Sequence, residues 1–117
     1  MGDRAPMTGR TFENTREDID RAIEDFSVQM VAKLLLTRHR THWMHCDADL
    51  LLKRLHDEVR ELDAEMSALV NAGQPLDSHK RKAIIRECAD VANFAMMIAD
   101  KMTWAGTRTW LHNEGGA

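Results

Sequence analysis

Residues 83–99, which read AIIRECADVANFAMMIA, decide the fold. Charge in this apolar run is limited to Arg86, Glu87 and Asp90. At about 100° per residue in an α-helix, both acids fall on the side that also carries the large apolar residues Ile84, Val91, Phe94 and Ile98. That side should face a core. The run therefore predicts a buried helix with two carboxylates on its inner face.

Apolar residues recur at helical spacing in three segments, which predicts helices at roughly 15–37, 48–71 and 78–103. Asn14 or Thr15, followed by acids at 17 and 18, is typical of a capping box at the first helix. Gly73 and Pro75 predict a short turn that returns the third helix antiparallel to the second. No segment has the pattern of a strand. We therefore expect an all-α fold, an antiparallel helical bundle of three main helices plus a short C-terminal segment.

The length of 117 residues suits one domain, with a flexible arm at 1–13, the helical domain at 14–105 and a tail at 106–117. The third helix is apolar nearly all round, so its outer face is expected to meet another subunit. A net charge of −3 without a basic face argues against binding a nucleic acid polymer. From the sequence we expect neither a signal peptide nor an apolar membrane span, and the two cysteines are too few for a disulfide framework. We expect a cytoplasmic protein.

A second pair of acids, Glu58 and Glu61, lies one turn apart beside the apolar seam of the second helix. If the second and third helices pack antiparallel, both pairs can face each other. Burying unpaired charge is unfavourable, and no stripe of Lys or Arg is patterned to meet these acids, so we infer a bound metal ion. Oxygen ligands suit Mg²⁺, with Mn²⁺ as a possible substitute. The alternative for Glu58 and Glu61 is a solvated helix face with internal ion pairs.

A di-iron site is disfavoured, because it needs a Glu-x-x-His motif on each of two helices and no Glu here has His three residues later. Zinc is also disfavoured. His39, His42, His45 and Cys46 crowd into one short segment without the separated ligand pairs of a structural site.

The run Asp57-Glu58-Val-Arg-Glu61, 25 intervening residues and then Glu87-Cys-Ala-Asp90 resembles the Glu-Glu-x-x-Glu and Glu-x-x-Asp motifs of MazG-like nucleoside triphosphate pyrophosphohydrolases. Asp57 departs from the first Glu of that motif and is left out of the ligand set. The resemblance covers roughly residues 26–102. It implies that Glu58, Glu61, Glu87 and Asp90 hold Mg²⁺.

The same resemblance implies hydrolysis of a nucleoside triphosphate to the monophosphate and pyrophosphate, a role in cleaning the nucleotide pool, and a homodimer or homotetramer. We expect Glu61 to orient or deprotonate the attacking water. The alternative is a non-catalytic module whose methionine-rich third helix, with Met96, Met97 and Met102, binds a partner.

Five further residues are candidates for binding the substrate. Lys33 and Arg38, near the end of the first helix, can reach phosphates or lie in solvent. Trp43 can stack on a base or plug the core. Asn93 can bond a base, a sugar or a neighbouring helix, and Lys101 can approach a phosphate or remain exposed.

Overall fold

The computed structural model describes residues 13–36, 43–73 and 75–105. Within them lie α1 (Arg16–Leu36), the 3₁₀-helix η2 (Trp43–His45), α2 (Ala48–Ala72) and α3 (Ser78–Ala105), with no strand in these ranges. The all-α prediction is confirmed, and each helix end lies within two residues of its predicted position. The predicted tail and all of the predicted arm except Glu13 lie outside the described residues.

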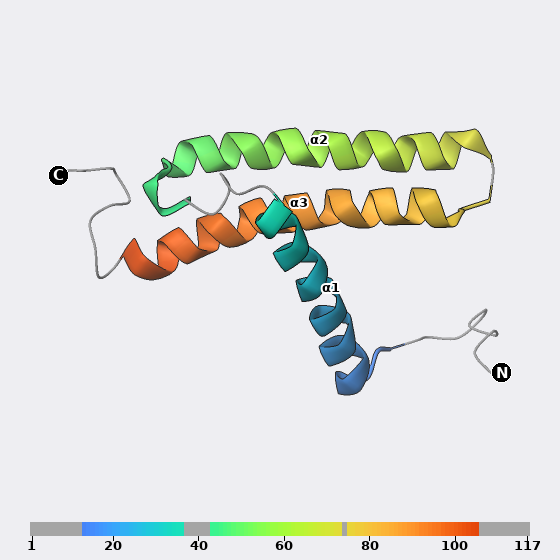
Figure 1. The fold of residues 1–117 in the computed structure, drawn as a ribbon, viewed down its shortest axis with the longest axis horizontal. Helices are drawn as coiled ribbons and strands as arrows, with labels where there is room; N and C mark the ends of the chain where they lie inside the picture. Colours follow the sequence, from blue (N-terminus) through green and yellow to red (C-terminus); the bar gives the residue numbers. More distant parts are fainter. Residues whose placement is uncertain (1–12, 37–42, 74, 106–117) are drawn as a thin grey trace.

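Helices α2 and α3 form an antiparallel pair (Figure 1). Gly73 ends α2 with φ at 64°, a left-handed conformation that glycine adopts without strain. Asp77 Oδ1 then accepts a 2.8 Å hydrogen bond from the backbone N–H of Lys80, which caps the start of α3 and lowers the pKa of Asp77. The predicted turn is therefore confirmed, and it places the middle of α2 beside the middle of α3.

The core is small and lies where η2, the start of α2 and the second half of α3 meet. Leu51, Phe94 and Met97 are its buried members. Partly buried residues pack around them, namely Leu34, Trp43, Cys46, Leu55, Met96 and Ile98. Met96 and Met97 therefore belong to the core, whereas Met102 is 47% exposed. A methionine-rich binding face is not available as a whole.

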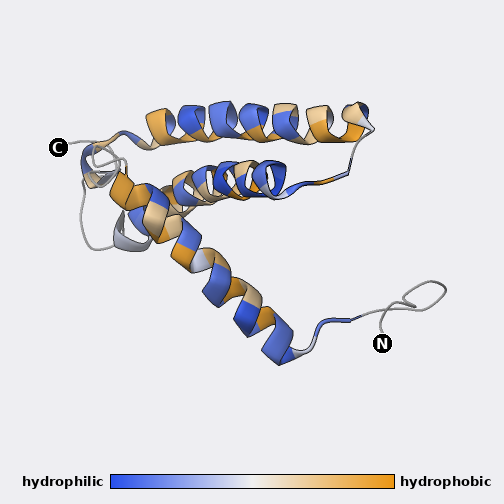
Figure 2. Cartoon of the chain, turned by 45° about the vertical axis from the view of Figure 1, so that its right-hand side comes forward, coloured by the Kyte–Doolittle hydropathy of each residue, from blue (hydrophilic) through white to orange (hydrophobic). Residues whose placement is uncertain are grey.

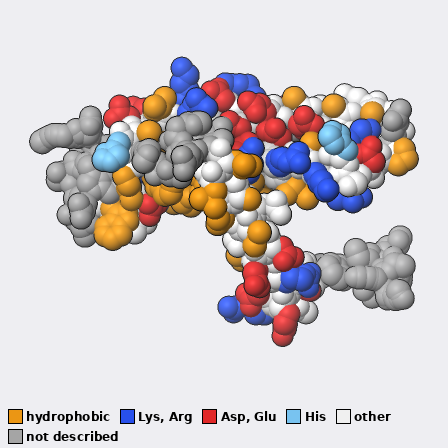
Figure 3. All heavy atoms as spheres, in the orientation of Figure 1, with side chains coloured by type: hydrophobic (Ala, Val, Ile, Leu, Met, Phe, Trp, Pro, Cys, Tyr) orange, Lys and Arg blue, Asp and Glu red, His pale blue; other side chains and the backbone are white. Residues whose placement is uncertain are grey.

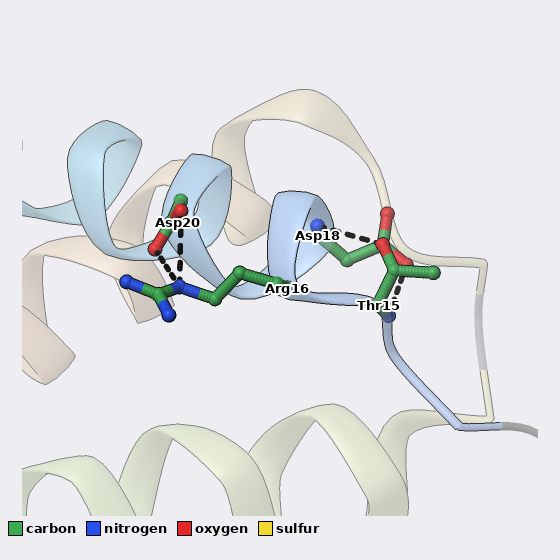
Figure 4. Close-up of polar contacts among 4 residues, drawn as sticks. All are labelled: Thr15, Arg16, Asp18 and Asp20. Atoms are coloured by element: carbon green, nitrogen blue, oxygen red, sulfur yellow. Dashed lines mark hydrogen bonds and ion pairs between the residues drawn. The ribbon is translucent and has the colours of Figure 1, made fainter.

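Helix α1 departs from the expected bundle, because it crosses α3 and its first half projects away from the α2–α3 pair (Figures 1 and 2). None of its 21 residues is buried. The predicted capping box is present at its start: Thr15 Oγ1 accepts from the N–H of Asp18 (3.1 Å), and Asp18 Oδ2 accepts from the N–H of Thr15 (2.9 Å), as Figure 4 shows. The sequence thus predicted this helix and its cap correctly. It did not predict that the first half of the helix projects from the bundle (Figure 1).

No helix in the described ranges has the length and apolar character needed to cross a membrane.

Candidate metal centre

Three carboxylates converge between the middle of α2 and the middle of α3. Glu58, Glu61 and Glu87 each offer one oxygen, and these oxygens all lie within 4.8 Å of one another. Glu58 is only 4% exposed, Glu87 is half-buried and Glu61 is exposed. In Figure 3, acidic side chains gather along the middle of α2. The antiparallel pairing of the two helices brings together three of the four predicted metal ligands.

Glu87, like Glu58, has a buried carboxylate oxygen, Oε1, without a hydrogen-bond partner among the described residues. Burial raises the pKa of Glu87, and the negative charges of Glu61, Asp90 and Glu58 raise it further, while Lys33 opposes the shift. The carboxylate is therefore held where its charged form is disfavoured unless a cation joins it.

Asp90, the fourth predicted ligand, lies outside this group of three oxygens. Its Oδ2 is 3.3 Å from Nζ of Lys33 on α1, and its side chain is only 8% exposed. Our expectation that no basic side chain meets the buried acids was therefore wrong for Asp90. Helical periodicity within one segment could not reveal this partner, because Lys33 comes from a helix that crosses α3. The role of Asp90 as a metal ligand stays a prediction.

The donor set fits a hard divalent cation. It consists of carboxylate oxygens alone, which Mg²⁺ and Mn²⁺ prefer over the nitrogen and sulfur ligands typical of zinc. The ligand atoms are close enough to share one ion, and the orphaned Oε1 of Glu87 needs a positive partner. Among the described residues, His45 and Cys46 are not part of this group, while His39 and His42 lie outside the described ranges.

An open hollow of about 520 Å³ lies on α2 beside the carboxylates. It is lined by Arg54, Asp57, Glu58, Arg60, Glu61 and Ala64. Arg60 pairs with Asp57 one turn away, and Arg54 lies over the ring of Phe94, with Cζ 5.8 Å from the ring centroid. The sequence analysis missed both arginines. Their spacing could have predicted them, since Arg54 precedes Glu58 by four residues and Arg60 follows Asp57 by three, both about one helical turn.

A second, apolar cavity of about 170 Å³ shares Arg54 with this hollow. Its other lining residues are Trp43, Cys46, Leu50, Leu51, Phe94 and Met97. Since a cavity of about 150 Å³ can hold benzene, this one has room for an aromatic ring. Trp43 is half-buried at its wall, and its Nε1 donates a 3.0 Å hydrogen bond to Asp100 Oδ2. Trp43 therefore packs against the core and lines a cavity at the same time.

The remaining predicted substrate residues have structural partners. Asn93 is 1% exposed, and its Nδ2 donates to the carbonyl of Met30 on α1 (3.1 Å), which is the neighbouring-helix alternative. Its Oδ1 is buried without a hydrogen-bond partner among the described residues. Lys101 is fully buried, so the exposed alternative was wrong, and its Nζ donates to the carbonyl of Met44 in η2 (3.2 Å). Arg38 lies outside the described ranges.

Comparisons with known proteins give no match for this chain, whether against family models, curated proteins or solved structures. The resemblance in the acidic motifs therefore remains an expectation, and the geometry of the site is the basis for the function that follows.

Proposed function

We propose that this protein is a Mg²⁺-dependent hydrolase that converts nucleoside triphosphates, ribo or deoxy, to the monophosphate and pyrophosphate. The observation that carries the proposal is the convergence of Glu58, Glu61 and Glu87 within 4.8 Å, with an orphaned buried oxygen on Glu87. Carboxylates in this state need a cation, and a bound cation makes an acidic surface attractive to a polyanion. The MazG-like motifs point to the same chemistry.

Glu58 and Glu87, both withdrawn from solvent, are suited to hold the ion, and Asp90 is the further ligand that the motif implies. Bound Mg²⁺ would supply neutralisation of phosphate oxygens and a lower pKa for a water molecule. Glu61 is the exposed member of the group, so it is placed to orient or deprotonate a water at the edge of the hollow. Arg54 and Arg60 line that hollow and can bind phosphate oxygens that the ion leaves unpaired.

The two neighbouring cavities support a nucleotide over a simple polyphosphate. The hollow beside the acids is charged, the cavity beside Trp43 is apolar, and Arg54 lines both. A molecule with a polyanionic end and a flat aromatic end matches this arrangement. Trp43 is the residue that we propose to contact the base.

The remaining predicted residues have supporting roles in the proposal. Lys33 and Arg38 are proposed to bind phosphate, with Lys33 first released from Asp90. Asn93 has an amide oxygen available for a ligand, and Lys101 acts by holding η2 in place.

We further propose a homodimer or homotetramer in the cytoplasm, where Cys46 and Cys88, both free cysteines, remain reduced.

A panel assay tests the function. Purified protein is mixed with each common NTP and dNTP plus Mg²⁺, and pyrophosphate and monophosphate are quantified. We expect release from at least one substrate, and a loss of at least about 100-fold in Glu87→Gln, since removing a metal-bound charge removes several kcal/mol of stabilisation.

The matched control is Glu65→Gln, the same substitution on an exposed acid one turn from Glu61 and outside the three-carboxylate group. It should retain activity. If no substrate yields pyrophosphate, and Glu87→Gln binds Mg²⁺ as wild type does in calorimetry, the non-catalytic partner-binding module is the better description.

A further inference from the structure

The first half of α1 has apolar side chains that are largely exposed in the described part of the chain. Ile19 is 46% exposed and Ile23 is 63% exposed, and further along the helix Val31 and Leu35 are 54% and 69% exposed. Helices shorter than about 12–15 residues are marginal in water, and most helical stability in proteins comes from packing of an apolar face. A projecting helix with this composition therefore calls for a partner surface.

The same half of α1 carries unpaired negative charge. Residues 17–25 contain five acids. Two of them pair within the helix, Asp20 with Arg16 and Asp18 with Arg21. The other three, Glu17, Glu24 and Asp25, have no ion-pair partner among the described residues.

The corner between α1 and the start of α3 has the opposite charge. A groove of about 360 Å³ lies there, lined by Gln29, Ser78, Arg81, Lys82, Ile85 and Arg86. No acidic side chain in the described ranges pairs with its three basic residues. In Figure 3, basic side chains gather to the right of the junction where α1 meets α3. Ile85, 36% exposed, adds an apolar wall.

We propose that this groove receives the first half of α1 from a second copy of the chain, in a reciprocal two-fold contact. Three unpaired acids on α1 match three unpaired bases in the groove. At about 100° per residue, Ile23 lies beside Glu24 and meets the apolar surface at Ile85, whereas Ile19 lies on the far side of the helix. Within the described residues, no ion pair joins these acids to the groove of the same chain. Gln29 already lines the groove, and a straight helix rises about 1.5 Å per residue, so Glu17 lies roughly 18 Å along the helix axis from it. Each copy in a two-fold dimer offers one helix and one groove.

Charge reversal tests the contact on the full chain, independently of the proposed enzyme activity. One variant carries Glu24→Lys and Asp25→Lys, and the other carries Arg81→Glu and Arg86→Glu. Analytical ultracentrifugation over a concentration series gives the dimer dissociation constant. Each variant alone should dimerise on the order of a hundredfold more weakly than wild type, because like charges now face each other in both halves of the contact.

The decisive sample is an equimolar mixture of the two variants. Both halves of a mixed dimer then pair opposite charges, so affinity should return to within about tenfold of wild type. Recovery also shows that both variants are folded. The matched control, Asp63→Lys with Glu65→Lys, reverses two exposed acids on α2 and should leave the dissociation constant unchanged.

Three results would each overturn the proposal: a wild type that stays monomeric at every concentration, reversals without effect, or a mixture that does not recover. A zero-length carbodiimide cross-linker gives a second reading. Covalent dimers of wild type should contain peptides that join Glu24 or Asp25 of one copy to Lys82 of the other, and their absence from such dimers would count against it.

Discussion

Helix α1 and the second half of α3 are both rich in apolar residues, yet they differ in what they bury. Between Ala89 and Lys101, α3 buries Asp90, Asn93 and Lys101 together with Phe94 and Met97, whereas α1 buries no residue at all. The difference lies in their neighbours. Helix α3 touches α1, η2 and α2, and α1 touches chiefly α3. An apolar pattern predicts which face can be buried, but the number of packed elements decides whether it is.

The buried polar side chains of α3 form the hydrogen bonds and the ion pair that link it to the other elements. Lys101 bonds the carbonyl of Met44 in η2, Asn93 bonds the carbonyl of Met30 in α1, and Asp90 pairs with Lys33. Buried polar groups are retained when they are satisfied. Removing each of these interactions in turn therefore measures how much the contact with each element contributes to the free energy of unfolding.

The largest effect is expected for Lys101→Ala. Removal of a fully buried side chain leaves a cavity and strips the Met44 carbonyl of its donor, so the free energy of unfolding should fall by about 3 kcal/mol. Chemical denaturation measures the change. Lys53→Ala, on the exposed face of α2, is the control and should change stability by less than about 0.5 kcal/mol. Equal effects of the two substitutions would show that η2 does not depend on α3.

Lys33→Met should have the next largest effect. It removes the ammonium that faces the buried Asp90 at 3.3 Å, and we expect a loss of about 2 kcal/mol because Lys33 is itself partly solvated. Mg²⁺ should bind several-fold more tightly, since a positive charge near the carboxylates is gone. Turnover should fall if Lys33 binds phosphate.

The matched control is Lys53→Met on the exposed face of α2, which removes the same charge from a residue outside the ion pair with Asp90. Calorimetric titration with Mg²⁺ compares the two variants. Unchanged or weaker Mg²⁺ binding in Lys33→Met would show that Lys33 does not oppose a cation at this site.

The sequence predicted the elements well and their contacts less well. Helical spacing, the capping box at Thr15 and the turn at Gly73 are local signals, so the helix bounds and the antiparallel α2–α3 pair followed from them. The convergence of Glu58, Glu61 and Glu87 followed from that pairing. The ion pair of Asp90 did not, because it depends on the angle at which α1 crosses α3, and no local pattern encodes that angle. Burial of Lys101 was missed because its partner, the carbonyl of Met44 in η2, comes from a segment far away in the sequence.

Acid titration of Glu87 is expected to give a smaller effect. Because burial and neighbouring carboxylates raise its folded-state pKa above the ordinary 4.5, the folded protein binds this proton more tightly than the unfolded chain. In a chelator, this group's contribution to the free energy of unfolding therefore falls as pH rises from about 4.5 through the raised value.

The difference in the free energy of unfolding between wild type and Glu87→Gln, measured as a function of pH, isolates that contribution from other titrating groups. We expect Glu87→Gln to be more stable above this window by about 1 kcal/mol, the usual scale of a single substitution, and to lose the advantage below it. Added Mg²⁺ should reverse the order, since it binds the ionised carboxylate. A difference that does not vary with pH would mean that Glu87 is not held in a disfavoured charged form.

Thr15→Ala should have the smallest effect on global stability, although it removes a complete capping box. Loss of such a cap typically lowers stability by about 1 kcal/mol, but only where the helix end unfolds together with the core. Since the first half of α1 touches no core residue, we expect a global change below about 0.5 kcal/mol.

Amide hydrogen exchange should instead accelerate locally over residues 16–24, measured by mass spectrometry. A global loss as large as that of Lys33→Met would mean that α1 unfolds as one unit with α3, and the contrast between the two helices would then fail. Protein concentration separates the remaining cases: protection of these amides that rises with concentration indicates a helix covered by a second copy, whereas protection that stays constant indicates a helix that stands alone.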